Sequence, residues 1–480
     1  MAVRLTGKAF GKQRLIIHSI FYGANAMKRK SLFVALGILA ALLIAAVRLF
    51  GVTLFNTYLN PNDRVYQFRR GLQYENGGYG TDQEKQAAVW MQKSAAQGYA
   101  PAETVLGLYY ESGRFVRQDS ALAFSYFSEA VKQGYAPAYG ELGLCYEKGA
   151  GVKQDAAKAV SLYRQGAEKG DSICEYSLGL CYHNGTGIGK DSAKAVSWLE
   201  KAAGQGLKPA DNTLGGWYEN GDGVTRDPVR AADYFVRGSN GNDAQSQYNL
   251  GLCYLNGKGV AKDEAKAVSL FQQAAAQGYA AAYDKLGRCY EDGKGVAKNE
   301  ATAVTYFRQG AQAGDADAEG NLGCCYFNGV GVARDDAQAF EWFSKSAAQG
   351  DAGGEYNTGI CYQTGRGVAK DGKQAFELFS KSAAQGYLLS IDQVGECYFY
   401  GTGVPVDYAK AVEWYRKAAA QGNARAYEML GWCYYQGEGV PADYNQAGIN
   451  LKKSVDLGNA DAARYLGLLV LNDDGTYTKK

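Results

Sequence analysis

Histidine and proline are scarce in this chain of 480 residues, which contains two of the first and seven of the second. The histidines, His18 and His183, are too few to build the common zinc sites, and no Ser–His or Cys–His pair is visible. No Ser-x-x-Lys motif occurs, so the serine mechanism of penicillin-binding proteins and β-lactamases has no nucleophile here. We therefore predict no catalytic residue, no metal ligand and no cofactor.

Acidic side chains are absent from residues 1–48, which carry eight Lys and Arg residues. The whole chain has 51 basic and 49 acidic side chains, so the part after Arg48 has a net charge of −6. A mildly acidic body lacks the Lys/Arg stripe that binds a phosphate backbone. This charge distribution argues against a nucleic-acid partner.

Long apolar runs are confined to one place, where the charge-free Ser31–Val47 is extended past Arg48 by Leu49–Phe55. About 20 apolar residues span a bilayer as a helix. We predict a transmembrane anchor over residues 31–55, after a basic leader of residues 1–30 whose true start could be Met27. A cleaved signal peptide and a buried helix of the globular body are the alternatives.

The basic residues of the leader, such as Lys28, precede the apolar run. This bias predicts a single-pass membrane protein with a cytoplasmic N-terminus and the rest of the chain on the extracytoplasmic (periplasmic) side. Unpaired cysteines suit a reducing cytosol, so a cytoplasmic location of the body stays open.

Glycine is abundant, with 63 residues, and one glycine column recurs every 36 residues without insertion or deletion. The column comprises Gly71, Gly107, Gly143, Gly179, Gly215, Gly251, Gly287, Gly323, Gly359, Gly395, Gly431 and Gly467. A tyrosine follows three residues later in eleven of these repeats, from Tyr74 to Tyr434, and an alanine column runs from Ala87 to Ala447. Such a fixed period is the signature of a solenoid.

Each repeat has the pattern of two helices, as the repeat around Gly251 illustrates. Ser246, Leu250, Cys253 and Tyr254 share one helical face. The glycine-containing turn 256–260 ends that helix, and Asp263 can cap a second helix that buries Ala267 and Phe271. One pair cannot bury its apolar faces alone, so neighbouring pairs must stack.

These patterns predict an all-α protein, an α/α superhelical solenoid of 36-residue helix pairs preceded by one transmembrane helix. Eleven repeats occupy residues 63–458, after a linker over residues 56–62. Residues 459–480 are predicted to form a capping helix, Asp461–Leu471, and a polar tail.

The repeat resembles the Sel-1-like repeat, a relative of the tetratricopeptide repeat, with the pattern A-x-x-x-L-G-x-C-Y-x-x-G-x-G-V-x-x-D-x-x-K-A followed by aromatic residues and A-A-x-Q-G. Residues 394–422 read VGECYFYGTGVPVDYAKAVEWYRKAAAQG, with Val394 in the leucine place. The resemblance implies a right-handed superhelix that acts as an adaptor in protein complexes. It names no single partner.

Eight of the ten cysteines share one repeat column, which predicts that they pack as small buried residues. They are Cys145, Cys181, Cys253, Cys289, Cys325, Cys361, Cys397 and Cys433. Stacked helices lie about 10 Å apart, whereas a disulfide needs Cα atoms within about 7 Å. Disulfides and a metal site remain weaker alternatives. Some secreted relatives cross-link each helix pair with two cysteines, but this chain has one per repeat.

The tetratricopeptide resemblance implies that the first helix of each pair lines a concave groove, at places three before, one after and four after the repeat glycine. Aromatic residues at these places are the predicted partner-binding residues: Tyr176, Tyr248, Phe327, Tyr356, Phe399, Trp432 and Tyr435. The other interpretation is that these rings pack against neighbouring turns.

We therefore expect a membrane-anchored scaffold or adaptor, not an enzyme, that binds a protein or peptide through the solenoid surface and the membrane through its N-terminal helix. The alternatives are a secreted hydrolase or penicillin-interacting envelope protein, and a purely structural spacer.

Overall fold

The computed structural model describes residues 60–76 and 81–480, and in these residues it contains twenty-three helices and two short strands. The predicted leader over residues 1–30 and the anchor over residues 31–55 lie outside the described residues. In the part of the chain that is described, no helix is both long enough and apolar enough to cross a bilayer.

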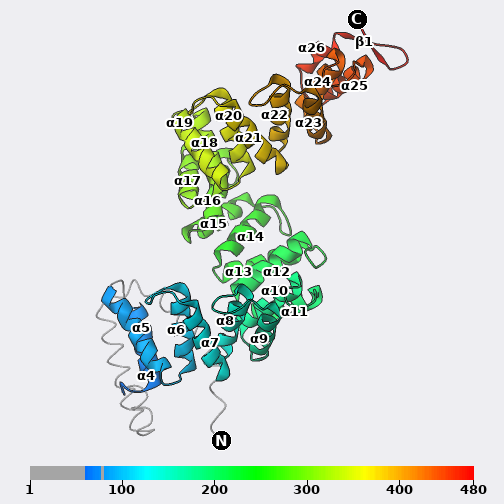
Figure 1. The fold of residues 1–480 in the computed structure, drawn as a ribbon. Helices are drawn as coiled ribbons and strands as arrows, with labels where there is room; N and C mark the ends of the chain where they lie inside the picture. The colour runs from blue at the N-terminus through cyan, green and yellow to red at the C-terminus, as the bar shows by residue number, and fades with distance from the viewer. Residues whose placement is uncertain (1–59, 77–80) are drawn as a thin grey trace. The chain divides into compact units, whose positions relative to one another are not determined.

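The chain divides into an N-terminal unit that ends at Gln205 and a C-terminal unit that begins at Gly206, each built of consecutive helix pairs (Figure 1). The N-terminal unit contains α4 (Arg64–Asn76), α5 (Thr81–Ala95), α6 (Ala100–Ser112), α7 (Ser120–Lys132), α8 (Ala136–Lys148), α9 (Ala156–Glu168), α10 (Ser172–Asn184) and α11 (Ser192–Gly204). The predicted all-α solenoid of helix pairs is confirmed.

The C-terminal unit continues the same alternation of first and second helices. It contains α12 (Lys208–Asn220), α13 (Pro228–Asn240), α14 (Ala244–Asn256), α15 (Glu264–Ala276), α16 (Ala280–Asp292), α17 (Glu300–Gln312), α18 (Ala316–Asn328), α19 (Asp336–Ala348), α20 (Ala352–Thr364), α21 (Gly372–Ala384), α22 (Leu388–Tyr400), α23 (Tyr408–Ala420), α24 (Ala424–Gln436), α25 (Tyr444–Asp456) and α26 (Ala462–Leu466).

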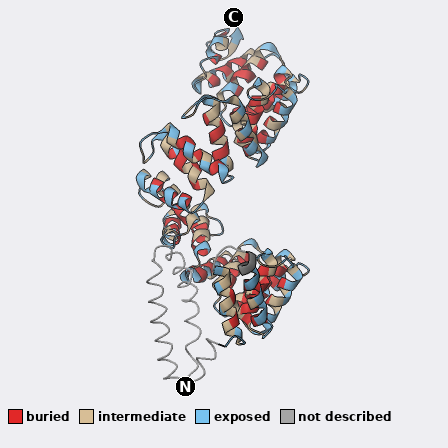
Figure 2. Ribbon diagram, turned by 90° about the vertical axis from the view of Figure 1, so that its left-hand side faces the viewer, coloured by how far each residue is buried: buried red, intermediate tan, exposed pale blue. Residues whose placement is uncertain are grey.

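Within a pair, the repeat glycine of the first helix lies under a large side chain of the second. Phe271 on α15 is fully buried against Gly251 on α14, and Tyr415 on α23 against Gly395 on α22. Figure 2 shows the buried residues on the inner faces of the helices of each unit. Close helix approach with one large apolar side chain against each repeat glycine, a ring in most pairs and Leu199 or Leu451 in others, therefore makes the core.

The ends of the helices follow the pattern that the sequence predicts. Asp263 accepts a hydrogen bond from the backbone N–H of Lys266 at 2.9 Å, as the expected N-cap of α15. Gly257 ends α14 in the left-handed conformation, with φ of 68°.

The second glycine of a turn, where the repeat has one, contacts the preceding repeat. A Cβ placed on Gly259 would lie 1.9 Å from the carbonyl oxygen of Pro228, the first residue of α13. The same contact recurs at Gly367, where the Cβ would lie 1.9 Å from the carbonyl oxygen of Asp336. The turn of one repeat thus rests on the second helix of the repeat before it.

The C-terminal end differs from the predicted capping helix Asp461–Leu471. Helix α26 stops at Leu466, and an antiparallel hairpin of β1 (Leu469–Leu471) and β2 (Tyr477–Lys479) follows. The Tyr477 ring lies against Gly448 on α25, where a Cβ would be 2.1 Å from it. The hairpin is favoured over a longer helix because it lets Leu469 and Tyr477 cover the end of the core.

All ten cysteines are free thiols, and each member of the repeat column is buried. The prediction that this column packs as small buried residues is confirmed. Burial raises the pKa of the Cys397 thiol to about 12, with a further contribution from the Glu396 charge. Among the described residues, no His, Cys, Asp and Glu side chains group in a way that could hold a metal ion.

Candidate functional site

The seven aromatic residues predicted to bind a partner all lie on first helices. Tyr176 belongs to the N-terminal unit and the other six belong to the C-terminal unit. Phe399 is buried, and the rest are half-buried. The contacts of each ring show whether it packs inside the array or stays accessible to a partner.

Two of these tyrosines join consecutive repeats. The ring centroid of Tyr248 lies 5.8 Å from that of Phe271 in its own repeat and 5.2 Å from that of Tyr279 in the next. Tyr356 has the equivalent neighbours, Phe379 at 5.9 Å and Tyr387 at 5.5 Å. These contacts support the packing interpretation for both rings.

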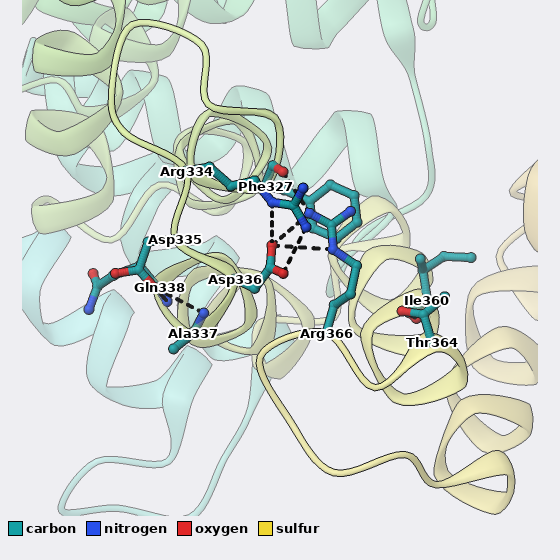
Figure 3. A network of polar contacts seen from close by, with 9 residues as sticks. All are labelled: Phe327, Arg334, Asp335, Asp336, Ala337, Gln338, Ile360, Thr364 and Arg366. Atoms are coloured by element: carbon teal, nitrogen blue, oxygen red, sulfur yellow. Dashed lines mark hydrogen bonds and ion pairs between the residues drawn. The ribbon is translucent and has the colours of Figure 1, made fainter.

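Phe327 is covered by the turn that follows α20. The Arg366 guanidinium lies 3.3 Å from the ring centroid and donates to the Phe327 carbonyl oxygen at 2.8 Å. Figure 3 shows Arg366 and Arg334 converging on the Asp336 carboxylate. Hydrogen bonds from these two residues hold the pKa of Asp336 well below its usual value, and the bond from Arg366 contributes most. This network links two repeats and leaves no free Phe327 ring.

The contacts of Phe399 support the interpretation that its ring packs against neighbouring turns. It is 9% exposed, and its ring lies 4.9 Å from that of Tyr400, 5.1 Å from that of Tyr408 and 6.4 Å from that of Tyr415. Phe399 therefore packs in the core of its own repeat, because the turn after α22 and the start of α23 close over it.

Trp432 and Tyr435 on α24 form an aromatic cluster near the C-terminus. Their rings stack at 6.1 Å, and Trp432 also lies 4.9 Å from Tyr465 on α26. Tyr435 contacts Tyr444 at 5.6 Å. Both rings stay half-buried rather than buried, so part of the cluster faces solvent.

An acidic group that sequence reasoning missed lies on the same helices. The Arg425 guanidinium forms ion pairs with Asp392 and Glu396 on α22, and Glu428 on α24 lies close enough for its charge to act on Arg425. Arg425 donates to Glu396 through Nε at 2.7 Å, whereas Asp392 Oδ2 lies 3.8 Å from the same Nε. Asp392 is 4% exposed, and its Oδ1 is buried without a hydrogen-bond partner.

Two other buried carboxylates show how different Asp392 is. Asp284, at the equivalent place of an earlier repeat, accepts from Asn321 at 2.6 Å and pairs with Lys285 and Arg288. Glu355 accepts from Gln385 at 2.8 Å. The sequence carries a signal for the acidic group, because Asp392 and Glu428 both stand three residues before a repeat glycine, a place that aromatic residues occupy in other repeats.

The comparisons with known proteins follow the repeat register. The family model described as Sel1 repeat matches residues 65–99, 100–135, 136–171, 172–207, 210–243, 244–279, 280–315, 316–351, 352–387, 390–423 and 424–459. No curated protein matches the chain significantly.

Three solved structures illustrate the range of similarity to the chain. A protective antigen of uropathogenic Escherichia coli strains with an SLR fold is 35% identical over 84% of this chain and 87% of its own, with a TM-score of 0.62. A Sel1 repeat protein from Oxalobacter formigenes is 30% identical over 64% of this chain and 90% of its own, with a TM-score of 0.48. Cysteine rich protein B of Helicobacter pylori is 24% identical over 28% of this chain and 96% of its own, with a TM-score of 0.23.

Proposed function

Because the chain belongs to the Sel1 repeat family, whose members typically mediate protein–protein interaction and are generally non-enzymatic, we propose that it is a scaffold that binds a protein or peptide partner through its solenoid surface. The observation that carries the proposal is the unbroken register of eleven matched repeats between residues 65 and 459. Such an array offers an extended surface and no inserted segment for chemistry.

We place the partner surface at the last repeats of the C-terminal unit. Of the seven predicted residues, Trp432 and Tyr435 best fit an anchor role, because they are half-buried and cluster with Tyr465. Tyr400 adds an exposed ring, and Tyr465 is among the groups that influence its hydroxyl. Half-exposed aromatic clusters are typical centres of binding energy.

The test is partner capture by the full-length protein with Trp432 and Tyr435 both changed to Ala. The matched control is Trp414→Ala, since Trp414 is also a half-buried tryptophan but lies on the second helix α23. The proposal predicts at least tenfold less captured partner for the double variant, an unchanged amount for the control, and unchanged helix content by circular dichroism. Undiminished capture by the folded double variant would remove this surface from the account.

The membrane-anchored form of the scaffold rests on the sequence. We propose that residues 31–55 anchor the chain, with the N-terminus in the cytoplasm and the repeats outside it, because the basic residues precede the apolar run. A reporter fused after Lys480 is then active only in the extracytoplasmic compartment. Activity confined to the cytoplasm contradicts this topology.

A further inference from the structure

The acidic group on α22 and α24 has more negative charge than its own chain neutralises. Asp392 and Glu396 share the guanidinium of Arg425, which binds Glu396 most closely, and the charge of Glu428 acts on both Asp392 and Arg425. Glu428 is 7% exposed and accepts from the neutral amide of Asn459 at 2.8 Å. A buried carboxylate without a matched donor is costly, and a second cation would relieve that cost.

Burial, followed by the charges of Glu396 and Glu428, raises the pKa of Asp392 to about 7, although Arg425 acts in the opposite direction. The carboxyl therefore lacks the counter-charge that would hold it ionised. Together with the unpartnered Oδ1, this marks a place for a positively charged group.

We infer that this acidic group receives a basic side chain, an arginine or lysine of the protein partner, which pairs with Asp392 and Glu428 while Arg425 stays on Glu396. The inference deepens the proposed function and rests on it. Arg425 Nε lies 2.7 Å from Glu396 but 3.8 Å from Asp392, so Arg425 can keep its bond to Glu396 while a second cation pairs with Asp392.

The rings around the carboxylates suit an organic cation. Tyr400 is 61% exposed, and its hydroxyl lies close enough to Glu396, Arg425, Tyr465 and Glu428 to be influenced by their charges. This places the acidic group and the aromatic cluster on one surface. Guanidinium and ammonium groups bind aromatic faces and carboxylates together.

Basic side chains already lie over aromatic rings in this part of the chain. Lys417 lies 4.0 Å above the Trp414 ring, and Arg464 lies 4.5 Å above the Tyr465 ring. A metal ion is the poorer candidate, because among the described residues no group of carboxylates is arranged to hold one. A basic peptide segment therefore complements the surface by charge and by its capacity for cation–ring contacts.

The experiment measures binding of a fluorescently labelled decapeptide of alternating Arg and Gly to the full-length protein by fluorescence anisotropy. A peptide with citrulline in place of Arg keeps the shape and removes the charge. We expect the Arg peptide to bind at least tenfold more tightly than the citrulline peptide. Equal affinities, or no binding of the Arg peptide, would overturn the inference.

Three variants locate the site. Asp392→Asn and Glu428→Gln are expected to weaken binding of the Arg peptide at least tenfold, whereas Glu355→Gln, which removes a buried carboxylate from an earlier repeat, leaves it within twofold. Equal losses in all three would mean diffuse electrostatic attraction and would overturn the assignment. Asp392→Asn removes a buried, incompletely paired charge, so it is expected to fold.

Arg425→Gln separates electrostatic binding of the peptide from damage to the surface, because the two predict opposite changes in affinity. Loss of the internal cation leaves the carboxylates more negative, so the Arg peptide should bind at least threefold more tightly, whereas a damaged surface would bind it more weakly. Weaker binding by this variant contradicts the inference. Capture of a partner by the wild-type protein, together with equal affinity for both peptides, would refute the basic ligand and leave the scaffold function intact.

Discussion

The ring of Phe271 lies directly on Gly251, so that a Cβ at residue 251 would stand 2.6 Å from the ring atom Cε1. Equivalent glycine–aromatic contacts recur through the array, for example between Gly287 and Phe307. The first helix and the second helix of a pair therefore approach at a distance that only glycine permits.

We expect Gly251→Ala to lower the free energy of unfolding by about 1–3 kcal/mol, because the added methyl group overpacks a filled core. Gly216→Ala is the matched control, since it is also in a first helix but nothing lies within 4 Å of the added Cβ. The control should gain about 0.5–1 kcal/mol from better helix propensity. Urea unfolding followed by circular dichroism measures both, and equal effects would contradict the packing account.

The second glycine of the turn makes a sharper prediction about contacts between repeats. Gly259→Ala adds a methyl group 1.9 Å from the Pro228 carbonyl oxygen at a φ of 72°. Gly278→Ala adds one at a φ of 81° with nothing within 4 Å. Gly278→Ala should therefore cost about 1–2 kcal/mol of conformational strain, and Gly259→Ala should cost clearly more in the same urea experiment. A smaller loss for Gly259→Ala would show that the turn does not rest on the preceding repeat.

The repeat columns made the helix pairs and their caps predictable, because each pair repeats the same local contacts. Links between repeats were harder to predict. Arg366 meets Asp336 across 30 residues, and the equivalent place varies between repeats, from Arg114 and Lys258 to Val330 and Glu438. The burial of Phe399 could not be predicted, because spacing on a helix does not reveal that the following turn closes over it.

The C-terminal hairpin was missed for a local reason. Asp474-Gly475 between two apolar alternating segments is a hairpin signal, but the repeat register pointed to one more first helix. Once the register ends, no following repeat covers the last pair, and Leu469 and Tyr477 fill that place.

Native protein should react with a bulky maleimide in two phases. Cys324 is the one cysteine that is not fully buried, and burial raises the pKa of its thiol to about 11. It should label first but slowly, and the other nine only after denaturation, because reaction requires an exposed thiolate. Mass spectrometry counts the labels, and Cys324→Ser should remove the first phase. Persistence of that phase in the variant would place an accessible thiol elsewhere.

Stability should depend on pH through Asp392. Its pKa is about 7 in the folded protein and 3.8 ordinarily, so between these values the folded state binds the proton more tightly. Stability is therefore lost as pH rises from about 4 to about 7, and Asp392→Asn removes that loss. The variant should gain on the order of 2–4 kcal/mol over wild type at about pH 8, with little difference near pH 4.

Urea midpoints of both proteins at several pH values measure this difference. Glu396, Glu428 and Arg425 remain in the variant, so their charges contribute similarly to both curves. A difference between wild type and variant that is independent of pH would refute the burial argument.

The account's central claim is that the C-terminal repeats form a protein-binding surface, and site-specific photo-crosslinking in the full-length protein tests it most directly. A photoreactive phenylalanine replaces Tyr400 on this surface or, as the control, the exposed Glu377 on the second helix α21. We predict a discrete protein adduct from position 400, lost when Trp432 and Tyr435 are changed to Ala, and none from position 377. No adduct from position 400, or the same adduct from both positions, would contradict the claim.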